Sequence, residues 1–318
     1  MLNLINLLIK YTGFSEVELN SIIAKAPTNY KKYSIKKRNG GNRTIYHPAK
    51  ETKTLQYVLL NYYLNTFPVH KCAFAYIKGN TSPLLKNALK HKNFKYSICL
   101  DLKDFFPSIR PSDLLNILTA NKTLTREEIL TLTNLLFISQ KNGLPSLPIG
   151  APTSPIISNI VMYDLDNKIN TLAHKINKSS VYTRYADDIV FSTNIKGACL
   201  VFYKRLESLL TKTNGPKLTI NKLKTNLCSR KTRRIVTGLV ICPNATISLG
   251  RKNKKYVKKL LLDFKYNKLD LKMKHHLSGY LAYILDVEPD FYNRLTLKYG
   301  GEIVNDALKQ TRPIISSK

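Results

Sequence analysis

The sequence Val181-Tyr182-Thr183-Arg184-Tyr185-Ala186-Asp187-Asp188-Ile189-Val190-Phe191 carries β-branched and aromatic residues on both sides of a short acidic centre. This pattern predicts two strands joined by a tight turn, with Asp187 and Asp188 at its tip. Two adjacent carboxylates repel each other, so a turn that holds them together is costly unless a cation neutralises them. For a lone Asp-Asp pair, an ordinary surface turn is the simpler interpretation.

A second acidic segment far upstream favours the cation site. In Ser97-Ile98-Cys99-Leu100-Asp101-Leu102 a carboxylate appears where an apolar strand should leave the core. If the two strands lie side by side, Asp101 meets Asp187 in an oxygen-rich pocket suited to Mg²⁺. Such a pocket is the arrangement needed for phosphoryl transfer by two metal ions.

The overall charge of the chain indicates a polyanionic partner. The 318 residues include 51 Lys and Arg against 20 Asp and Glu, which gives a formal charge of +31. Such a field favours nucleic acid. A basic membrane-surface protein is disfavoured, because no stretch approaches the roughly 18 uninterrupted apolar residues of a membrane span. The length predicts a substantial core and two or three subdomains.

The N-terminus and the cysteines predict a cytoplasmic protein. The first ten residues lack a basic lead-in and a small-residue cleavage site, which is typical of an amphipathic helix rather than a signal peptide. The five cysteines are odd in number and scattered, and none is paired with Cys or His as in a zinc site. We therefore expect reduced cysteines in a cytoplasmic protein.

A basic hairpin is predicted near the N-terminus. Two strand-like runs between Tyr33 and Pro48 meet at Asn39-Gly40-Gly41, a strong hairpin signal. The hairpin carries four basic residues: Lys36, Lys37, Arg38 and Arg43. They form either a solvated charged surface or a flap that closes on a triphosphate, for which the forked geometry of arginine is suited.

The remaining pattern predicts an α+β fold, with a sheet packed by helices. We expect helices over residues 1 to about 30, 48–64, 156–172 and 198–210, with a helix cap at Ser15 before Glu16 and a capping box at Thr125 and Glu128. One strand is expected over 233–241. A Gly/Pro-rich loop spans 143–155. No internal repeat is present.

The C-terminal part combines basic and aromatic residues. Six Lys and Arg crowd residues 251–259, and a helical segment with Tyr280 and Tyr283 follows. Basic residues interleaved with tyrosines suit the backbone and bases of a nucleic acid. A solvated basic face over core tyrosines is the alternative.

Taken together, these segments resemble a reverse transcriptase over nearly the whole chain. Tyr185-Ala186-Asp187-Asp188 is similar to the YADD box, and Asp101 with Phe105-Phe106 is similar to the first acidic motif of that family. Residues 148–155 resemble its template and nucleotide-binding loop, and Leu223-Lys224-Thr225 resembles the lysine motif that follows the catalytic hairpin. Four matches in the expected order are very specific.

Two shorter signatures resemble the bacterial retron reverse transcriptases. Asn87-Ala88-Leu89-Lys90-His91 matches a retron Asn-Ala-x-x-His element, although His91 alone is more typical of a structural histidine. Val236-Thr237-Gly238 matches a retron Val-Thr-Gly element. The resemblance implies a right-hand polymerase fold with fingers over 1–95, a palm over 96–240 with a helical fingers insertion at 111–146, and a basic helical thumb over 241–318. We expect no appended ribonuclease H, maturase or endonuclease domain.

The resemblance also implies roles for individual residues. Asp101, Asp187 and Asp188, with Leu102, would bind two Mg²⁺ ions, and Phe106 would exclude a 2′-hydroxyl from the incoming nucleotide. Further dNTP-binding residues would be Lys36, Lys37, Arg43, Phe105, Ile149, Gly150 and Lys224. RNA-binding residues would be Asn87, His91, Val236, Thr237, Gly238, Arg251, Lys254, Lys255 and Lys258. Many relatives have Gln in place of Ile149, whose side chain cannot donate a hydrogen bond to the nucleotide.

For a retron enzyme the implied partners are unusual. The polymerase would recognise its own structured noncoding RNA, prime DNA synthesis from the 2′-hydroxyl of an internal guanosine, and produce branched multicopy single-stranded DNA. Host ribonuclease H would trim the template, and an effector protein would act with the complex in anti-phage defence. Two alternatives are another bacterial reverse transcriptase, of the group II intron or diversity-generating type, and an idle RNA-binding protein on this fold. A third is a basic RNA-binding protein with an ordinary Asp-Asp turn.

Overall fold

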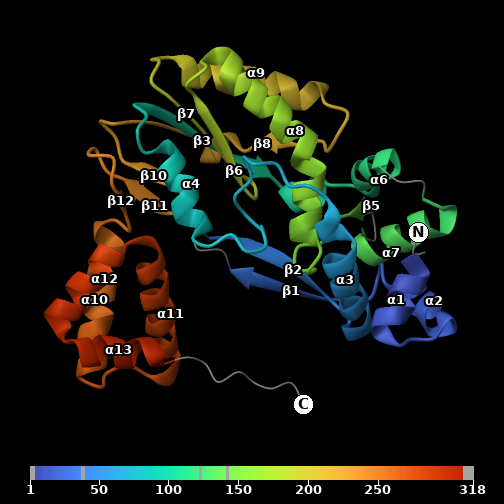
Figure 1. Ribbon diagram of the computed structural model, residues 1–318, viewed down its shortest axis with the longest axis horizontal. Coiled ribbons are helices and arrows are strands. Elements are labelled where there is room, and N and C mark those ends of the chain that lie inside the picture. The colour runs from blue at the N-terminus through green and yellow to red at the C-terminus, as the bar shows by residue number, and fades with distance from the viewer. Residues whose placement is uncertain (1–3, 37–39, 122–123, 141–142, 311–318) are drawn as a thin grey trace. The chain divides into compact units, whose positions relative to one another are not determined.

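The computed structural model describes residues 4–36, 40–121, 124–140 and 143–310. Its contacts divide the chain into two compact units, the first formed by residues 1–79 and 98–226 and the second by residues 80–97 and 227–318. Both units combine helices with strands, as the α+β prediction requires (Figure 1). These units cut across the predicted fingers, palm and thumb boundaries, which remain a prediction.

The central sheet of the first unit has the strand order β6–β7–β3–β8. The predicted acidic hairpin is present, because β6 and β7 pair antiparallel and Tyr185 lies opposite Asp188. The upstream strand β3 lies next to β7, and β8 pairs with the end of β3 through Leu102 and Ile220. These strands are β3 (Tyr96–Lys103), β6 (Val181–Tyr185), β7 (Asp188–Thr193) and β8 (Thr219–Ile220).

Two long helices, α8 (Ser154–Ile176) and α9 (Ala198–Lys212), lie side by side against this sheet, α8 on β6 and α9 on β7 (Figure 1). Each helix has an apolar face, because its buried residues recur at helical spacing. The ring of Phe202 on α9 stacks on that of Phe191 on β7, with centroids 4.2 Å apart. The apolar faces of both helices and the sheet together form the core of this unit.

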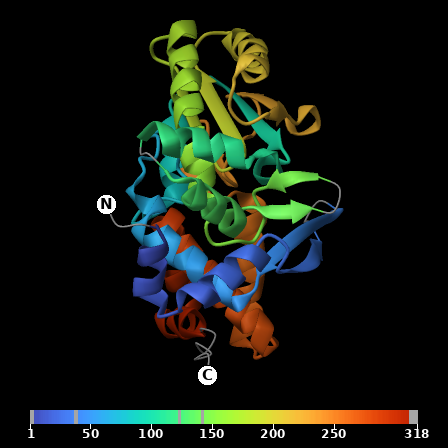
Figure 2. The same cartoon turned by 90° about the vertical axis from the view of Figure 1, so that its right-hand side faces the viewer.

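The N-terminal helices of the first unit pack against one another, and the predicted basic hairpin is present as β1–β2. Two predicted caps are confirmed as capping boxes, Ser15 with Glu18 and Thr125 with Glu128. Figure 2 shows a further hairpin, β4–β5, in light green, which the sequence pattern did not predict. The elements are α1 (Leu4–Thr12), α2 (Glu16–Lys25), β1 (Tyr30–Lys36), β2 (Asn42–Pro48), α3 (Lys50–Tyr62), η1 (Leu64–Thr66), α5 (Phe105–Ser108), α6 (Pro111–Asn121), α7 (Arg126–Leu136), β4 (Ile138–Gln140), β5 (Gly143–Ser146) and η2 (Lys222–Lys224).

The second unit contains a small sheet and a bundle of helices. The prediction of one strand over 233–241 is wrong, because Thr237 (φ 48°) and Gly238 (φ 81°) form a turn that splits it into the hairpin β10–β11. Two consecutive residues with positive φ favour a two-residue hairpin turn. The elements are α4 (Pro83–His91), β9 (Asn226–Ser229), β10 (Arg234–Val236), β11 (Leu239–Ile241), β12 (Ile247–Ser248), α10 (Arg251–Lys265), α11 (Leu271–Val287), α12 (Pro289–Tyr299) and α13 (Gly301–Lys309).

Within the described ranges, the model contains no helix that combines the length and the apolar character needed to cross a bilayer.

Candidate active site

The acidic turn between β6 and β7 is the centre of the site. Ala186 adopts a left-handed conformation (φ 56°), which lets Ala186 and Asp187 connect the strands within two residues. The main-chain N–H of Leu102 on β3 donates a hydrogen bond of 2.9 Å to the carbonyl of Asp187. The structure therefore brings Asp101, Asp187 and Asp188 together from two strands 86 residues apart in the chain (Asp101 to Asp187).

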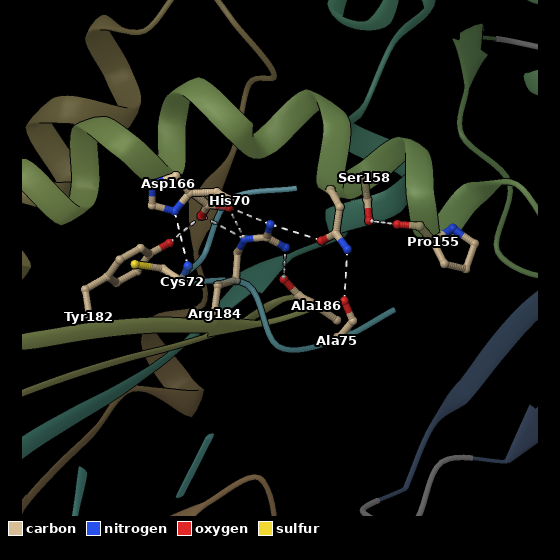
Figure 3. A network of polar contacts seen from close by, with 10 residues as sticks. His70, Cys72, Ala75, Pro155, Ser158, Asp166, Tyr182, Arg184 and Ala186 are labelled. Atoms are coloured by element: carbon tan, nitrogen blue, oxygen red, sulfur yellow. Dashed lines mark hydrogen bonds and ion pairs between the residues drawn. The ribbon is translucent and has the colours of Figure 1, made fainter. Parts of the chain in front are cut away.

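A buried arginine supports this turn (Figure 3). The guanidinium of Arg184, on β6, forms an ion pair of 2.7 Å with Asp166 of α8, and neither side chain is accessible to solvent. Its Nη1 donates to the carbonyl of Ala186 at 3.1 Å, so the same group holds the turn. The hydroxyl of Tyr182 donates to Asp166 at 2.6 Å. The network thus ties the acidic turn to α8.

The network extends to the neighbouring segment and to the start of α8 (Figure 3). Arg184 donates to the side-chain oxygen of Asn159 at 3.1 Å, and the Asn159 amide donates to the carbonyl of Ala75 at 2.9 Å. The segment around Ala75 also lies along β6, because the N–H of Arg184 donates to the carbonyl of Cys72 and the N–H of Phe74 donates to that of Arg184, each at 2.8 Å. The turn is therefore positioned by three separate stretches of chain.

Sequence reasoning missed Arg184, Asp166 and Asn159. The signal was present, because a charged residue stands inside an otherwise apolar strand and an aspartate stands in the apolar run of α8. Charged side chains are almost never fully buried unless they are paired. The sequence alone could not identify Asp166 as the partner of Arg184, because the two residues belong to different elements.

The carboxylates of the turn repel each other in the folded protein. Burial raises the pKa of Asp188 to about 6, with the charges of Asp187 and Asp101 acting in the same direction. Burial likewise raises the pKa of Asp187, and the charge of Asp101 adds to this. The folded site therefore disfavours full ionisation, and binding of a cation would relieve this cost.

Replacing Asp188 with Asn is expected to stabilise the metal-free protein in a pH-dependent way. Because the pKa of Asp188 is higher in the folded state, its contribution to stability is present below pH 4 and is lost as the pH rises through about 6. In EDTA at pH 8, Asp188→Asn should raise the Tm. Although neighbouring groups enclose Asp188, part of its side chain still reaches solvent, and the resulting screening limits the gain to about 1 kcal/mol, or about 2–4 °C.

This expectation is checked by thermal unfolding between pH 8 and pH 4. The gain should shrink steadily below pH 6, because Asp188 in the parent protein then becomes protonated. The matched control is Asp164→Asn, an exposed aspartate of α8, which should change the Tm little at any pH. A gain of equal size at pH 8 and pH 4 would point to packing instead of charge.

Asp101 is held by two side chains that follow β8. The ammonium of Lys224 contacts both carboxylate oxygens of Asp101, at 3.0 and 2.8 Å, and the Asn221 amide donates to one of them at 3.1 Å. The hydrogen bond to Asp101 also raises the pKa of Lys224. The resemblance to reverse transcriptases implied that Lys224 binds the nucleotide. In the structure, which contains no nucleotide, the partner of Lys224 is Asp101.

The donor set of the turn fits a divalent cation, although the geometry is not that of a ready-made metal site. Over the described ranges, no three Asp, Glu, His or Cys side chains are gathered closely enough to hold a metal ion as they stand. Both oxygens of Asp101 are also engaged by Lys224. Asp101, Asp187 and Asp188 nevertheless offer the oxygen ligands that a hard cation prefers, and a cation would offset the disfavoured ionisation of Asp187 and Asp188.

The basic hairpin contributes Arg43 to the site. The positive charge of Arg43, on β2, partly offsets the burial that raises the pKa of Asp187. Lys36 is exposed at the end of β1, opposite Asn42. Lys37, also predicted to bind nucleotide, lies outside the described residues together with Arg38.

The loop before α8 is packed against the same hairpin. The N–H of Tyr46 on β2 donates to the carbonyl of Ile149 at 2.8 Å. Gly150 has φ 123°, and a Cβ atom at this position would lie 2.7 Å from the carbonyl oxygen of Tyr46. Glycine is therefore required here by both conformation and space. Ile149 makes this contact through its main-chain carbonyl. The contact therefore does not depend on the side chain at this position, where many relatives have Gln.

Phe105 and Phe106 follow β3 directly. Phe105 is buried, whereas Phe106 is half-exposed, and its ring lies 5.5 Å from that of Phe105 and 6.3 Å from that of Tyr76. Tyr76 was not predicted as a site residue. Its φ of 61° is unusual for a bulky residue, and after burial the charge of Asp187 is the next cause that raises its pKa. Tyr76 and Phe106 therefore form an aromatic surface beside the acidic turn.

Both short signatures lie in the second unit, where the Val-Thr-Gly turn contacts the helix that carries the other signature. The hydroxyl of Thr237, in the β10–β11 turn, donates to the carbonyl of Leu84 on α4 at 2.9 Å. Val236 is buried and Gly238 is exposed. Asn87 and His91, on α4, are fully buried, and burial lowers the pKa of His91 to about 3, so this imidazole is neutral at physiological pH. The side chain of Asn87 has no hydrogen-bond partner among the described residues.

The predicted RNA-binding residues of α10 are unequally exposed. Arg251, Lys255 and Lys258 are exposed on this helix. Lys254 is instead half-buried and forms an ion pair with Glu288, which also accepts a hydrogen bond from the N–H of Leu249 at 2.9 Å. Lys254 thus has a structural partner within the second unit.

Comparison with known proteins agrees with this site. A family model described as reverse transcriptase (RNA-dependent DNA polymerase) matches residues 35–264. Retron Ec73 reverse transcriptase of Escherichia coli is 39% identical over 303 residues, covering 89% of this chain and 91% of its own. Retron Ec83 reverse transcriptase of Escherichia coli is 34% identical over 296 residues, with 90% and 92% covered. A solved telomerase from Candida albicans has a TM-score of 0.50 at 12% identity, covering 92% of this chain and 68% of its own.

The chain therefore belongs to the reverse transcriptase family and has the right-hand polymerase fold. Within that family it is a bacterial retron reverse transcriptase, an RNA-directed DNA polymerase that uses divalent metal ions as the family generally does. The predictions of fold class and enzymatic activity are thereby confirmed. The roles assigned to single residues remain predictions.

Proposed function

We propose that this polymerase copies its own structured noncoding RNA into multicopy single-stranded DNA, starting from the 2′-hydroxyl of an internal guanosine. The observation that carries the proposal is the similarity, along nine-tenths of the chain, to a protein named as a retron reverse transcriptase. The hydrogen bond from Thr237, in the Val-Thr-Gly signature, to Leu84, on the helix that carries the Asn-Ala-x-x-His signature, supports it. The product would be branched, with the DNA joined to RNA through a 2′ linkage.

In this proposal the acidic turn performs nucleotidyl transfer. Asp101, Asp187 and Asp188, with Leu102, would bind two Mg²⁺ ions, which activate the attacking hydroxyl and stabilise the leaving pyrophosphate when they are bound. Arg184 keeps the turn in place through the carbonyl of Ala186. Arg43, with Lys36 and Lys37 of the same hairpin, would bind the triphosphate, for which the guanidinium fork is suited.

The partners follow from the same proposal. Exposed Arg251, Lys255 and Lys258 of α10 would contact phosphates of the RNA, and the formal charge of +31 would strengthen the association. Asn87, His91 and Lys254 would act by shaping this unit, since they are buried or already paired. Host ribonuclease H would trim the template, and an effector protein would join the complex in anti-phage defence in the cytoplasm.

The proposal is tested by expressing the gene with its native flanking DNA and separating small DNA from total nucleic acid, with and without debranching enzyme. A band that shifts on debranching and is absent from Asp187→Ala is the expected result. A band that does not shift would show that the DNA is not branched, and the enzyme would then use conventional priming, as in the alternative of another bacterial reverse transcriptase. If purified protein does not extend any primer with Mg²⁺ and dNTPs, the idle RNA-binding alternative would be correct.

Phe106 is expected to select deoxynucleotides by steric overlap with a 2′-hydroxyl. Phe106→Ala should raise rNTP incorporation relative to dNTP by about 10- to 100-fold, which corresponds to about 1.4–2.8 kcal/mol of discrimination. Primer extension with each nucleotide checks this. The matched control is Tyr76→Ala, which removes the neighbouring ring and should leave the ratio near that of the parent protein. If Tyr76→Ala alone changes the ratio, Tyr76 is the gate.

A further inference from the structure

A second basic surface lies between helices α8 and α9 of the first unit. The two helices form a groove of about 450 Å³ that is lined by Lys168 and Lys175 from α8 and by Arg205 and Lys212 from α9. Its floor includes Leu172 and Leu209, which are half-buried, whereas the four cationic side chains are exposed. No role in nucleotide transfer has been assigned to any of these residues.

The spacing of the residues explains the groove. Lys168 and Lys175 are seven residues apart on α8, and Arg205 and Lys212 are seven apart on α9. Seven residues make about two helical turns, so each pair projects from one side of its helix about 10 Å apart. Because the helices are packed side by side (Figure 1), the two pairs form two parallel rows of positive charge.

This positive charge is not neutralised within the protein. Among the residues that the structure describes, none of the four cations has an acidic partner within ion-pair distance. The nearest acidic residues in sequence are engaged elsewhere, since Asp166 is buried with Arg184 and Glu207 lies 3.7 Å from Lys222. Concentrated like charge of this kind favours a polyanionic ligand.

The groove is separate from the acidic turn. The buried faces of α8 and α9, which include Ile169 and Leu206, pack toward the sheet that carries the turn. The groove residues Lys168 and Arg205 are exposed instead, on the other side of these helices. A ligand in the groove therefore does not occupy the place of the template and primer at Asp187.

The composition of the groove favours nucleic acid over protein. Its lining contains no aromatic and no acidic residue, whereas protein interfaces are enriched in aromatic residues and depleted in lysine. Thr171 and Ser208 add hydroxyl groups beside the cations. Hydroxyl, lysine and arginine side chains are the groups that contact phosphate and sugar oxygens, including the 2′-hydroxyls of RNA.

We propose that this groove binds the backbone of a double-stranded stem of the RNA partner, at a site distinct from the polymerising centre. The inference rests on the proposed function, because that function supplies a structured RNA before any DNA is made. Two rows of cations along the helices hold the phosphates of the stem. The groove thereby anchors one part of the RNA while another part is copied.

The test uses neutral substitutions that preserve helix propensity. A variant with Lys168→Gln, Lys175→Gln, Arg205→Gln and Lys212→Gln is compared with a control in which four exposed lysines outside the groove, Lys10, Lys25, Lys196 and Lys204, are changed to Gln. Both variants lose the same charge, and Lys204 lies on α9 itself. The probe is an RNA hairpin with a stem of about 16 base pairs, and a DNA hairpin of the same sequence serves for comparison.

The groove variant should bind the RNA hairpin about 10- to 100-fold more weakly than the control, with a salt slope lower by about 2–4 because each lost phosphate contact removes about 0.7–0.9. Equal weakening of both variants, or none in the groove variant, would overturn the proposal. A loss confined to the DNA hairpin would assign the groove to the product strand instead. Unchanged RNA binding with loss of a co-purifying acidic protein would make it a protein interface.

A second readout separates this inference from the proposed function. Extension of a short primer on a short template, which does not reach the groove, should be unchanged in the groove variant and lost in Asp187→Asn. If the parent protein makes no branched DNA in cells, the proposed function fails, yet the difference in RNA-hairpin affinity between the groove variant and its control still decides this inference.

Discussion

Asp187→Asn is expected to lower dNTP incorporation by at least about 1,000-fold, which corresponds to about 4 kcal/mol of transition-state stabilisation. The side chain is close to isosteric, and its loss of charge removes a carboxylate from the centre of the acidic turn. The structural role of this residue is carried by its main chain, since its carbonyl accepts the hydrogen bond from Leu102. The substitution should therefore abolish chemistry while the fold persists.

Single-nucleotide primer extension with Mg²⁺ measures this loss, and circular dichroism with an RNA-binding assay verifies that the protein is folded. Asp164→Asn, which removes an exposed carboxylate from α8, is the matched control and should retain activity. The variant lacks one of the carboxylates that would bind Mg²⁺. Addition of Mg²⁺ should therefore raise its Tm less than that of the parent protein. Activity within tenfold of the parent would place the catalytic carboxylates elsewhere.

Arg184→Met is expected to reduce the free energy of unfolding by about 3–5 kcal/mol, because it leaves the carboxylate of Asp166 buried without its cation. The loss should be large for two reasons that the structure makes visible. Both side chains of the pair are fully buried, and the guanidinium also binds Asn159 and the carbonyl of Ala186. Urea unfolding followed by circular dichroism measures the change.

A double variant separates charge burial from positioning of the turn. Arg184→Met with Asp166→Leu removes both charges, so much of the lost stability should return. Activity should remain low in this double variant, because no donor then holds the carbonyl of Ala186. Arg205→Met, at an exposed arginine of α9, should change stability by less than about 0.5 kcal/mol. If Arg184→Met is as stable as this control, the buried ion pair does not hold the fold.

Local patterns predicted those parts of the fold that local physics determines. The turn at Ala186 and Asp187, the two capping boxes at Ser15 and Thr125, and the hairpin around Gly40 and Gly41 each depend on residues within a few positions of one another. Their geometry can be predicted because the chain has few ways to satisfy its main-chain groups there. The strand at Asp101 could be predicted from its apolar alternation and its acidic end.

Contacts between distant elements could not be predicted in the same way. The partner of Arg184 lies on a helix 18 positions earlier, and the partner of Lys224 lies 123 positions earlier. The strand predicted over 233–241 was wrong because Thr237, a β-branched residue that favours strands, adopts a left-handed turn there beside Gly238. In each case the ion-pair partner or the main-chain conformation is determined by tertiary contacts, which cannot be predicted from the periodicity of the sequence.

The ion pair between Lys224 and Asp101 has a consequence for how the enzyme starts a cycle. One carboxylate cannot give both oxygens to an ammonium and also serve a metal ion fully, so a divalent cation at Asp101 would have to displace the lysine. The released ammonium would then be available to the phosphates of an incoming nucleotide. Without a metal ion, the protein itself supplies the counter-ion for one of its three acidic side chains.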